Sequence, residues 1–394
     1  MDPRKNPYAP GAGTPPPELA GRDAWIERAA IALDRIRSGR SARSLILHGL
    51  RGVGKTVLLN RIEVDAEARG FASVKIEAPE GRSLPALLIP ILRVILLRLD
   101  RGQRVRAALG IARKAFAGFV NAWKIKYKDI EISTEFEPER GLADSGHLDI
   151  DLTELLTSIG HAAREYDTAV ALFIDELQYV RDDELASLIR ALHEASQRQL
   201  PITMLAAGLP QLIGQMGRAK SYAERLFEFV QIDRLDDHAA RAALCIPAKK
   251  EHVDFEPLAI KEILDQTQGY PYFLQEWGRH AWNLADASPI SRSDAERATT
   301  LALAELDDGF FRVRFDRLTR AEKRYLRAMA ELGAGPHRSG DIAERLRMTV
   351  TSAAPLRNRL IAKGMIYSPA HGDTAFTVPL FDGFMKRILP KMDA

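Results

Sequence analysis

The sequence of 394 residues predicts an α/β protein of three layers, in which helices cover both faces of a parallel sheet. Continuous apolar runs such as 169–174 alternate with segments of helical periodicity, which is typical of parallel strands buried on both faces. Residues 236–297 show helical periodicity alone. From about residue 318 the pattern changes to helix, helix, helix and hairpin, which indicates a separate C-terminal module.

Composition and length fit a protein of two or three globular domains. Hydrophobic residues make up 46% and charged residues 28% of the chain, and the net charge of +3 is too small to indicate a nucleic-acid partner by itself. The single cysteine, Cys245, excludes an internal disulfide and favours a reducing cytoplasm. Residues 84–99 are the most apolar stretch, but a proline and two arginines interrupt it, so we expect a buried helix and no membrane partner.

Residues 1–17 are rich in proline and glycine, so we expect a disordered leader without the apolar core of a signal peptide. Residues 18–235 are expected to form the sheet domain. Its strands are expected at 45–48, 73–78, 169–174, 201–207 and 230–232. Its helices are expected at 24–37, 57–69, 84–122 with a break near Gly102, 152–166, 182–196 and 221–229. Apolar side chains alternate around Lys128, which predicts a hairpin insertion at about 123–146.

The segment Gly49–Thr56 fits the phosphate-binding loop pattern G-x-x-x-x-G-K-[ST]. Its glycines let backbone N–H groups surround nucleotide phosphates, Lys55 supplies a positive charge, and the Thr56 hydroxyl is a ligand for Mg²⁺. An apolar strand precedes the pattern and a helix follows it, which is the context that this loop requires. We therefore predict a fold of the P-loop NTPase class with a nucleotide site at Gly49, Gly52, Val53, Gly54, Lys55 and Thr56. The alternative is a glycine-rich turn with a surface lysine.

A second motif, Asp175-Glu176, directly follows the buried run 169–174. Carboxylates at the C-terminal end of a parallel strand lie where α/β sheets bind their ligands. We expect Asp175 to orient the Mg²⁺ shell and Glu176 to polarise the water that attacks the phosphate. In the alternative interpretation the two acids cap the helix expected at 182–196.

A helical lid and linker are expected at 236–317, and a winged helix-turn-helix at 318–394. The last segment carries 13 Lys and Arg against 7 Asp and Glu, a net charge of +6, so the rest of the chain is slightly acidic. Arg357, Arg359 and Lys363 on its third helix are therefore candidates to contact double-stranded DNA. In the alternative interpretation the apolar residues of this helix form the core of the module and the basic residues are a solvated face.

These motifs, in this order, resemble the AAA+ ATPases, and within them the origin-recognition-like (Orc-like) ATPase domain found in many bacterial proteins. The resemblance covers about residues 18–300. It rests on Leu19-Ala20-Gly21-Arg22, Gly49–Thr56, Leu172–Gln178, Gly141–Gly146, Ser221–Leu226 and Gly269-Tyr270-Pro271. The phosphate-binding loop and the acidic pair are specific for P-loop ATPases in general, and the other motifs narrow the choice.

The resemblance implies that the chain binds ATP with Mg²⁺ and hydrolyses it. It implies an ATP site between the core and the lid, with Arg22 near the adenine and Pro271 on the lid. By its position, Arg225 resembles an arginine finger, which reaches the γ-phosphate of a neighbouring subunit in a homo-oligomer. The alternative for Arg225 is a surface ion pair with Glu224 or Glu228.

Two departures from the family pattern predict slow hydrolysis. The strand expected at 201–207 has no Asn, Ser or Thr at its tip, where the family implies a polar sensor, and Gln178 is a candidate to orient the water instead. Many AAA+ lids carry an arginine shortly after the lid glycine, where Pro271 and Tyr272 stand here, as in the signalling branch with a Gly-x-Pro lid. Both departures leave nucleotide binding intact.

We therefore predict an ATP-binding ATPase that acts as a nucleotide-controlled switch and binds DNA through its winged helix. The alternative is a STAND-like signalling ATPase whose winged helix packs on its own core and contacts protein only. A third possibility is a helper in transposition or plasmid maintenance.

Overall fold

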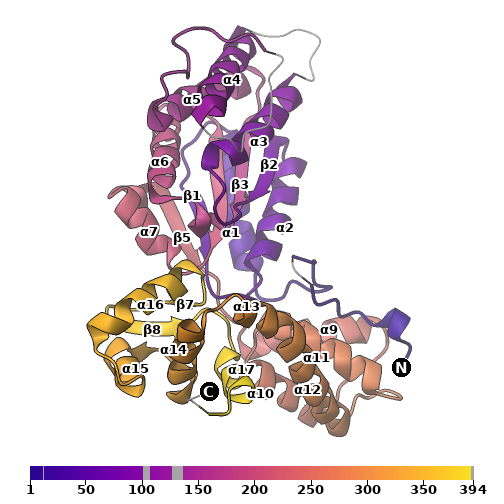
Figure 1. The fold of residues 1–394 in the computed structure, drawn as a ribbon. Coiled ribbons are helices and arrows are strands. Elements are labelled where there is room, and N and C mark those ends of the chain that lie inside the picture. The colour runs from indigo at the N-terminus through magenta and orange to yellow at the C-terminus, as the bar shows by residue number, and fades with distance from the viewer. Residues whose placement is uncertain (12, 101–106, 127–135, 392–394) are drawn as a thin grey trace. The chain divides into compact units, whose positions relative to one another are not determined.

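A computed structural model describes residues 1–11, 13–100, 107–126 and 136–391 (Figure 1). The chain forms two compact units. The first, called the sheet unit here, contains Arg22–His48 and Lys55–Gln231. The second, called the helical unit, contains Met1–Gly21, Gly49–Gly54 and Ile232–Ala394. The region predicted as a lid and the C-terminal module therefore belong to one unit.

Five parallel strands form the sheet of the sheet unit, in the order β2-β3-β4-β1-β5. They are β1 (Ser44–His48), β2 (Phe71–Glu77), β3 (Ala169–Asp175), β4 (Ile202–Gly208) and β5 (Phe227–Gln231). Every residue of β1, β3 and β4 is buried, because helices cover both faces of these strands. The predicted parallel α/β sheet is confirmed, although several strand ends differ from the predicted ones.

Helices form the two outer layers of this unit (Figure 1). They are α1 (Asp23–Arg37), α2 (Lys55–Ala68), α3 (Leu84–Leu99), α4 (Ala107–Lys126), α5 (Leu148–Glu165), α6 (Asp182–Gln197), α7 (Leu212–Ala219) and α8 (Ala223–Leu226), with a 3-10 turn η2 (Leu177–Tyr179). The connections from β1 to β2 and from β3 to β4 run in opposite directions along the sheet. Right-handed crossovers therefore place α2 on one face and α6 on the other. Helix α1 packs on α2, and α5 packs on α6.

The most apolar stretch of the sequence forms α3, whose N-cap is Ser83 and which retains Pro90 inside it. Most of its apolar side chains are buried in the core of the sheet unit, as the sequence predicted. Across the part of the chain that the structure describes, no helix combines the length and the apolar character that crossing a bilayer requires.

The region predicted as a hairpin insertion begins as a helix, which corrects the prediction for residues 123–126. Trp123 is buried near the end of α4, and its indole N–H donates a hydrogen bond of 3.0 Å to the buried carboxylate of Asp151. The buried rings of Phe116 and Phe119 precede Trp123 at helical spacing. This helical spacing decides the structure up to residue 126, although the sequence after Trp123 shows an alternation of apolar residues. Residues 127–135 of the predicted hairpin lie outside the described residues.

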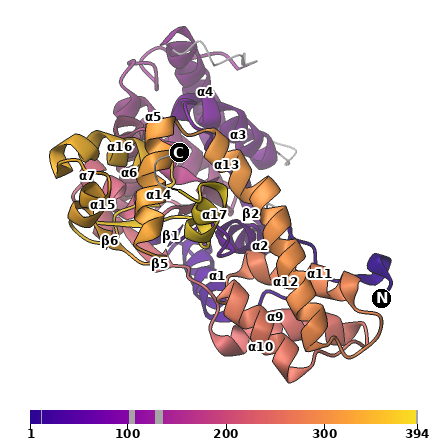
Figure 2. The same ribbon diagram turned by 60° about the horizontal axis from the view of Figure 1, so that its bottom comes forward.

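Four helices of the helical unit follow one another where the sequence showed helical periodicity alone, and Figure 2 shows their arrangement. They are α9 (Asp237–Lys250), α10 (Pro257–Thr267), α11 (Pro271–Leu284) and α12 (Arg292–Leu306). Helix α11 packs against the other three. A π-helical turn, η3 (Asp307–Phe311), joins α12 to α13 (Arg312–Asp316), so the predicted linker is largely helical.

The N-terminal segment, predicted to be a disordered leader, lies against α9 and α11. The Asn6 side chain donates a hydrogen bond of 3.0 Å to the carbonyl of Arg279, and the Trp282 indole N–H donates one of 3.0 Å to the carbonyl of Asp2. Tyr8 is 3% exposed. The sequence of this segment is mostly polar and proline-rich, so its composition did not indicate that Tyr8 is buried.

The C-terminal module contains the three helices and the hairpin expected from the sequence. They are α14 (Arg320–Glu331), α15 (Ser339–Arg345), α16 (Val350–Ala362), β7 (Ile366–Tyr367) and β8 (Asp373–Phe376). The structure adds β6 (His337–Arg338), which pairs with β8, and α17 (Phe381–Ile388). Ring centroids of Phe311, Phe381 and Phe384 lie 5.3 to 5.7 Å apart and join α17 to η3. The module is thereby packed on the turn that follows α12.

Candidate nucleotide site at the carboxyl edge of the sheet

The predicted phosphate-binding loop connects the buried strand β1 to α2. Gly52 and Gly54 have φ values of 80° and 89°, in the left-handed region that favours glycine. Lys55 and Thr56 are the first residues of α2, so backbone N–H groups without helical partners lie at the end of the loop. A loop of this kind at a helix N-terminus fits an anion such as a nucleotide phosphate.

The acidic pair lies at the same edge of the sheet as the end of β1, which leads into the loop. Strand β4 separates β1 from β3 and is aligned with both of them. His48 of β1 is opposite Gly208, and Ile174 of β3 is opposite Ala206. Asp175, the buried last residue of β3, is therefore almost level with the end of β1, at about 10 Å or two strand spacings.

Glu176 follows β3 in the left-handed conformation, with φ of 52°, and is half-buried. Its N–H donates a hydrogen bond of 2.8 Å to Oδ1 of Asp175, and its Oε2 accepts a hydrogen bond from Nε2 of Gln178 in η2. Oε1 of Gln178 in turn accepts a hydrogen bond of 3.0 Å from the N–H of Leu209, directly after β4. The amide of Gln178 therefore occupies the tip of β4, where the strand itself carries no polar side chain.

Lys55 and His48 set the charge at the start of the loop. Lys55 is 8% exposed and is therefore buried, and His48 is buried as well. Burial lowers the pKa of the His48 imidazole, and the nearby Lys55 ammonium lowers it further. We therefore assign the neutral form to His48 at neutral pH and the positive charge to Lys55. A buried cation beside a helix start attracts an anion.

Comparison with known families bears on this site. Residues 18–205 match the family described as "AAA ATPase domain". We call this segment the AAA ATPase domain after the family that it matches. Residues 308–385 match a family described as "Domain of unknown function (DUF8462)". A search of curated proteins found no match.

Three solved structures resemble the chain. The Walker-type ATPase PABY2304 of Pyrococcus abyssi has a TM-score of 0.57 and 16% identity, over 95% of this chain and 97% of that chain. The Orc1 protein of Aeropyrum pernix in complex with DNA has a TM-score of 0.46 and 15% identity, over 94% of each chain. The RuvB Holliday junction branch migration motor of Thermotoga maritima has a TM-score of 0.47 and 14% identity, over 91% and 92%. The first of these supports the fold of the AAA ATPase domain.

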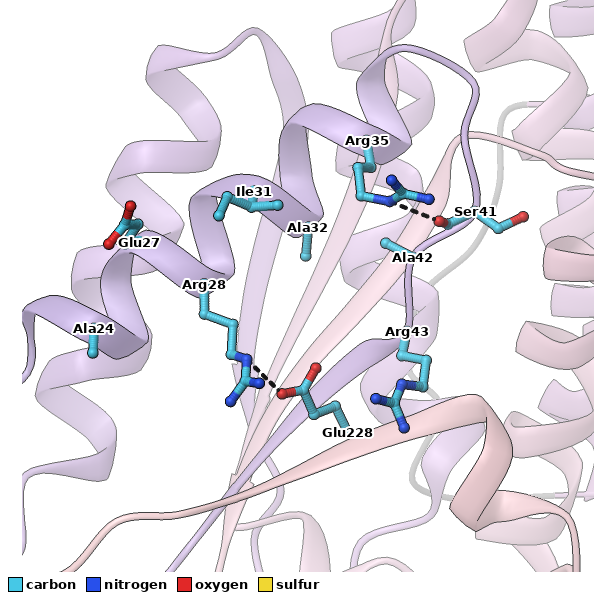
Figure 3. Close-up of a pocket in the computed structure, with 10 residues that line it drawn as sticks. All are labelled: Ala24, Glu27, Arg28, Ile31, Ala32, Arg35, Ser41, Ala42, Arg43 and Glu228. Atoms are coloured by element: carbon cyan, nitrogen blue, oxygen red, sulfur yellow. Dashed lines mark hydrogen bonds and ion pairs between the residues drawn. The ribbon is translucent and has the colours of Figure 1, made fainter.

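Arg225, the predicted arginine finger, follows the matched segment in the short helix α8 and is exposed. Within the described ranges it forms no ion pair. Glu228, one of the two partners suggested for it, pairs with Arg28 of α1 at 2.8 Å instead (Figure 3). The guanidinium of Arg225 is therefore accessible to a second molecule.

A groove of about 660 Å³ lies between α1 and β5 (Figure 3). Its lining includes the arginines Arg28, Arg35 and Arg43. Ser44 at the start of β1 pairs with Phe227 at the start of β5, so this groove lies toward the amino edge of the sheet. The phosphate-binding loop of the AAA ATPase domain lies at the opposite edge, and the groove is therefore a separate feature.

The two residues that the resemblance assigned to the nucleotide lie in different units. Arg22 precedes α1 in the sheet unit and is 6% exposed. Pro271 opens α11 in the helical unit. The N–H of the next residue, Tyr272, donates a hydrogen bond of 3.1 Å to the carbonyl of Gly52. The start of α11 thus contacts the phosphate-binding loop.

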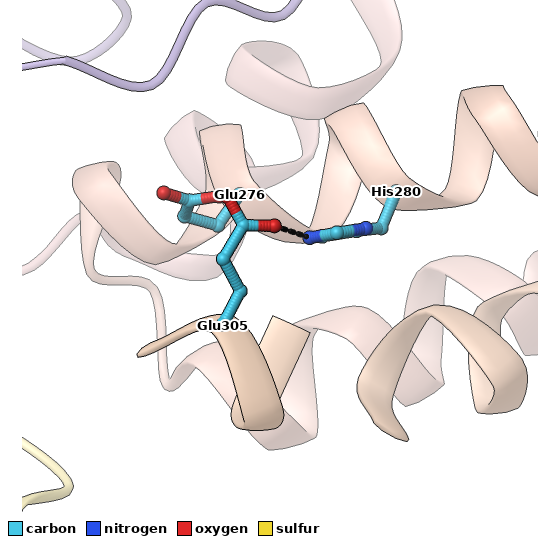
Figure 4. Close-up of side chains that lie close together, drawn as sticks. All are labelled: Glu276, His280 and Glu305. Carbon is cyan, nitrogen blue, oxygen red and sulfur yellow. Dashed lines mark ion pairs between the residues drawn. The ribbon is translucent and has the colours of Figure 1, made fainter. Parts of the chain in front are cut away.

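A cluster of potential metal ligands lies in the helical unit, outside the AAA ATPase domain. Ligand atoms of Glu276 and His280 on α11 and of Glu305 on α12 lie within 4.8 Å of one another (Figure 4). The Arg279 guanidinium donates hydrogen bonds of 3.0 Å to Glu276 and 2.7 Å to Glu305. Burial, followed by the charge of Arg279, lowers the pKa of His280. Because an arginine already balances the carboxylates, we assign this cluster a structural role between the two helices.

The three predicted DNA contacts are engaged within the C-terminal module to different degrees. Arg357 donates a hydrogen bond of 2.9 Å to Oγ1 of Thr374. Lys363 pairs with the buried carboxylate of Glu322 at 2.7 Å. Arg359 lies 3.8 Å from Glu322, and its side chain is 57% exposed. Arg359 is therefore the most accessible of the three.

Proposed function

We propose that this chain binds ATP at the loop Gly49–Thr56 and hydrolyses it slowly. The observation that carries the proposal is the alignment of the end of β1, which leads into the loop, with the Asp175-Glu176 pair after β3 at one edge of the sheet. The loop fits a nucleotide, because two left-handed glycines and a helix start supply N–H donors and Lys55 supplies a cation.

Mg²⁺ fits the same edge. Thr56 offers a hydroxyl at the start of α2 and Asp175 offers a buried carboxylate, and Mg²⁺ prefers such oxygen ligands together with phosphate oxygens. The ion, when bound, supplies positive charge that stabilises phosphoryl transfer. In this proposal Lys55 holds the phosphates and Glu176 positions the attacking water.

Two features support slow turnover. Strand β4 ends in Gly208, so its tip contributes no side chain toward the acidic pair. Helix α11 begins with Pro271 and Tyr272, at the position where many AAA+ lids carry an arginine. Slow hydrolysis suits a switch, because the bound nucleotide then sets the state of the protein for a long time.

Two variants test the nucleotide site. Lys55→Ala removes the phosphate charge and should abolish measurable binding of a fluorescent ATP analogue. Glu176→Gln keeps the size of the side chain but loses the carboxylate, so it should bind ATP without turning it over. Because Lys55 is buried, circular dichroism is needed to show that the first variant is folded. Undiminished ATP binding by folded Lys55→Ala would refute the assignment.

We further propose that the nucleotide controls the C-terminal module, which we interpret as a winged helix. The carbonyl of Thr377, directly after β8, accepts a hydrogen bond of 3.0 Å from the N–H of Arg51 in the loop. This contact favours a STAND-like signalling switch whose winged helix engages its own loop. DNA binding is the second candidate function, and it is favoured by the net charge of +6 on residues 318–394.

A gel shift with duplex DNA, in ADP and in a non-hydrolysable ATP analogue, separates the two candidates. A shift that depends on the nucleotide supports control of DNA binding. The absence of a shift in both states supports the signalling switch.

We also propose that ATP favours a homo-oligomer in the cytoplasm. The exposed guanidinium of Arg225, which forms no ion pair with the described residues, supports an oligomer, because a finger acts on a neighbouring subunit. The single cysteine, Cys245, supports the location. Light scattering with ADP and with the ATP analogue tests the assembly, and an equal mass in the two states would contradict it.

A further inference from the structure

The amide of Gln178 links two strands at the edge of the sheet where the acidic pair lies. Its Nε2 donates a hydrogen bond to Oε2 of Glu176, after β3. Its Oε1 accepts a hydrogen bond of 3.0 Å from the N–H of Leu209, after β4. Both polar atoms of the amide are therefore used, and each is used on a different strand end.

The absence of a side chain at Gly208 leaves room for this amide at the tip of β4. A Cβ built on Gly208 would lie 2.7 Å from Oε1 of Gln178 and 2.7 Å from Cδ2 of Leu212. Any side chain at position 208 would have to displace both of these groups. The glycine that deprives β4 of a polar tip is thus the residue that admits the amide of Gln178.

The backbone around Glu176 is fixed on both sides. Its N–H donates to Asp175, and its carbonyl accepts a hydrogen bond of 3.0 Å from the N–H of Tyr179. With the backbone held in the left-handed conformation, the direction of the carboxylate depends on the side-chain torsions. The hydrogen bond from Gln178 restrains those torsions.

We propose that Gln178 is the positioning residue for ATP hydrolysis: it holds the Glu176 carboxylate in one orientation relative to the end of β4. The inference rests on the function proposed above. An amide donor to a carboxylate adds a directed hydrogen bond, and a displacement of about 1 Å in a catalytic group can reduce a rate about 100-fold. The nucleotide-binding loop takes no part in this contact, so ATP affinity is independent of it.

Two substitutions of Gln178 remove its hydrogen bond to Glu176 in different ways. Gln178→Met keeps the length of the side chain and removes both hydrogen bonds. Gln178→Glu keeps an acceptor for the N–H of Leu209 and removes the donor to Glu176. For both variants we expect affinity for a fluorescent ATP analogue within about twofold of the wild type and single-turnover hydrolysis roughly 10- to 100-fold slower. If Gln178→Met fails to fold, Gln178→Glu carries the test.

The matched control is Gln215→Met. Gln215 lies on α7, is buried, and donates a hydrogen bond of 2.7 Å from its amide to the carbonyl of Val180, at the end of the same η2 turn. It therefore supports the turn but does not contact Glu176. We expect this variant to lose stability and to hydrolyse ATP at close to the wild-type rate.

A double variant gives the sharpest measurement. If Gln178 acts through Glu176, adding Gln178→Met to Glu176→Gln leaves the residual rate unchanged, because the group to be positioned is already missing. A further fall of tenfold would overturn the proposal, as would a wild-type rate in Gln178→Met or an equal fall in the control. If the wild type binds ATP but does not hydrolyse it, this proposal and the hydrolysis proposal both fail. Loss of the Gln178 effect alone leaves the proposed function intact.

Discussion

The ring of Tyr8 occupies the space that a side chain at Gly278 would need. A Cβ built on Gly278 would lie 2.7 to 2.8 Å from three atoms of the ring. Tyr8 is 3% exposed, and its hydroxyl donates a hydrogen bond to the carbonyl of Leu244. The N-terminal segment is therefore part of the core of the helical unit.

We expect Tyr8→Ala to lower the free energy of unfolding of the helical unit by about 3 kcal/mol, because a buried aromatic ring is removed from a packed core. Tyr8→Phe keeps the ring and loses one hydrogen bond, so its expected loss is about 1 kcal/mol. Urea unfolding followed by the fluorescence of Trp277 and Trp282 measures both, since both indoles lie on α11. Equal unfolding curves for Tyr8→Ala and the wild type would show that the segment does not contribute to the fold.

This contact also shows why part of the fold escaped prediction. The sheet could be predicted because buried parallel strands are continuous apolar runs, which a local window detects. The packing of the first ten residues could not be predicted, because it depends on one ring meeting a glycine far along the chain. The start of the region predicted as a hairpin was misassigned for a related reason. The helical spacing that ends at Trp123 begins before the segment predicted as a hairpin. The buried hydrogen-bond partner of Trp123, Asp151, lies after that segment.

The candidate site likewise has parts that the sequence could predict and parts that it could not. The loop Gly49–Thr56 and the pair Asp175-Glu176 are contiguous patterns, so the sequence alone located them. The hydrogen bond from Tyr272 to Gly52 and the link from Gln178 to Leu209 join residues far apart in the sequence. The only signal for the second link was negative: a glycine stands at the strand end where the family implies a polar side chain.

Nucleotide binding should change amide hydrogen exchange in the hairpin of the C-terminal module. Thr377 accepts a hydrogen bond from the N–H of Arg51, so ordering of the loop by phosphate should slow exchange in the peptide that contains 373–378. Mass spectrometry with and without the ATP analogue measures the difference. Lys55→Ala is the control, because it should show no change on adding the analogue. If the folded Lys55→Ala variant also showed slower exchange on adding the analogue, the change in exchange would not depend on the nucleotide site.

The stability of the sheet unit should fall in mild acid. The pKa of His48 is lowered by burial and by Lys55, so the unfolded chain binds a proton more readily than the folded chain. The free energy of unfolding should therefore decrease as the pH falls below about 6.5, the ordinary value for histidine. His48→Gln removes this contribution and should flatten the dependence between about pH 5 and 7. The exposed His371 provides the control substitution, His371→Gln, and an equal flattening in both variants would contradict the assignment.

Lys363 should stabilise the C-terminal module rather than serve only a ligand. Burial would raise the pKa of Glu322, but hydrogen bonds from Lys363 and Thr319 outweigh it and hold the pKa below its usual range. We expect Lys363→Met to lower the free energy of unfolding by about 2 kcal/mol, because it leaves a buried carboxylate with fewer partners. The ionised Glu322 contributes above its unfolded pKa, so the difference from the wild type should shrink as the pH falls below about 4.5. Urea unfolding at several pH values measures this, and a constant difference would contradict the role of the charge.

Arg359 gives the cleanest test of DNA binding, because its substitution should leave the module folded. Its side chain is 57% exposed and 3.8 Å from Glu322, so Arg359→Gln should change stability by less than about 0.5 kcal/mol. If Arg359 contacts a DNA phosphate, its loss should reduce the slope of log affinity against log salt by about 0.9, equally for different duplexes. The measurement is a salt titration of duplex affinity for wild type and variant, in ADP and in the ATP analogue. Identical slopes would remove Arg359 from the contact. Since Arg357 and Lys363 are engaged inside the module, the DNA hypothesis would then lose the most accessible of its predicted contacts, and the signalling switch would be favoured.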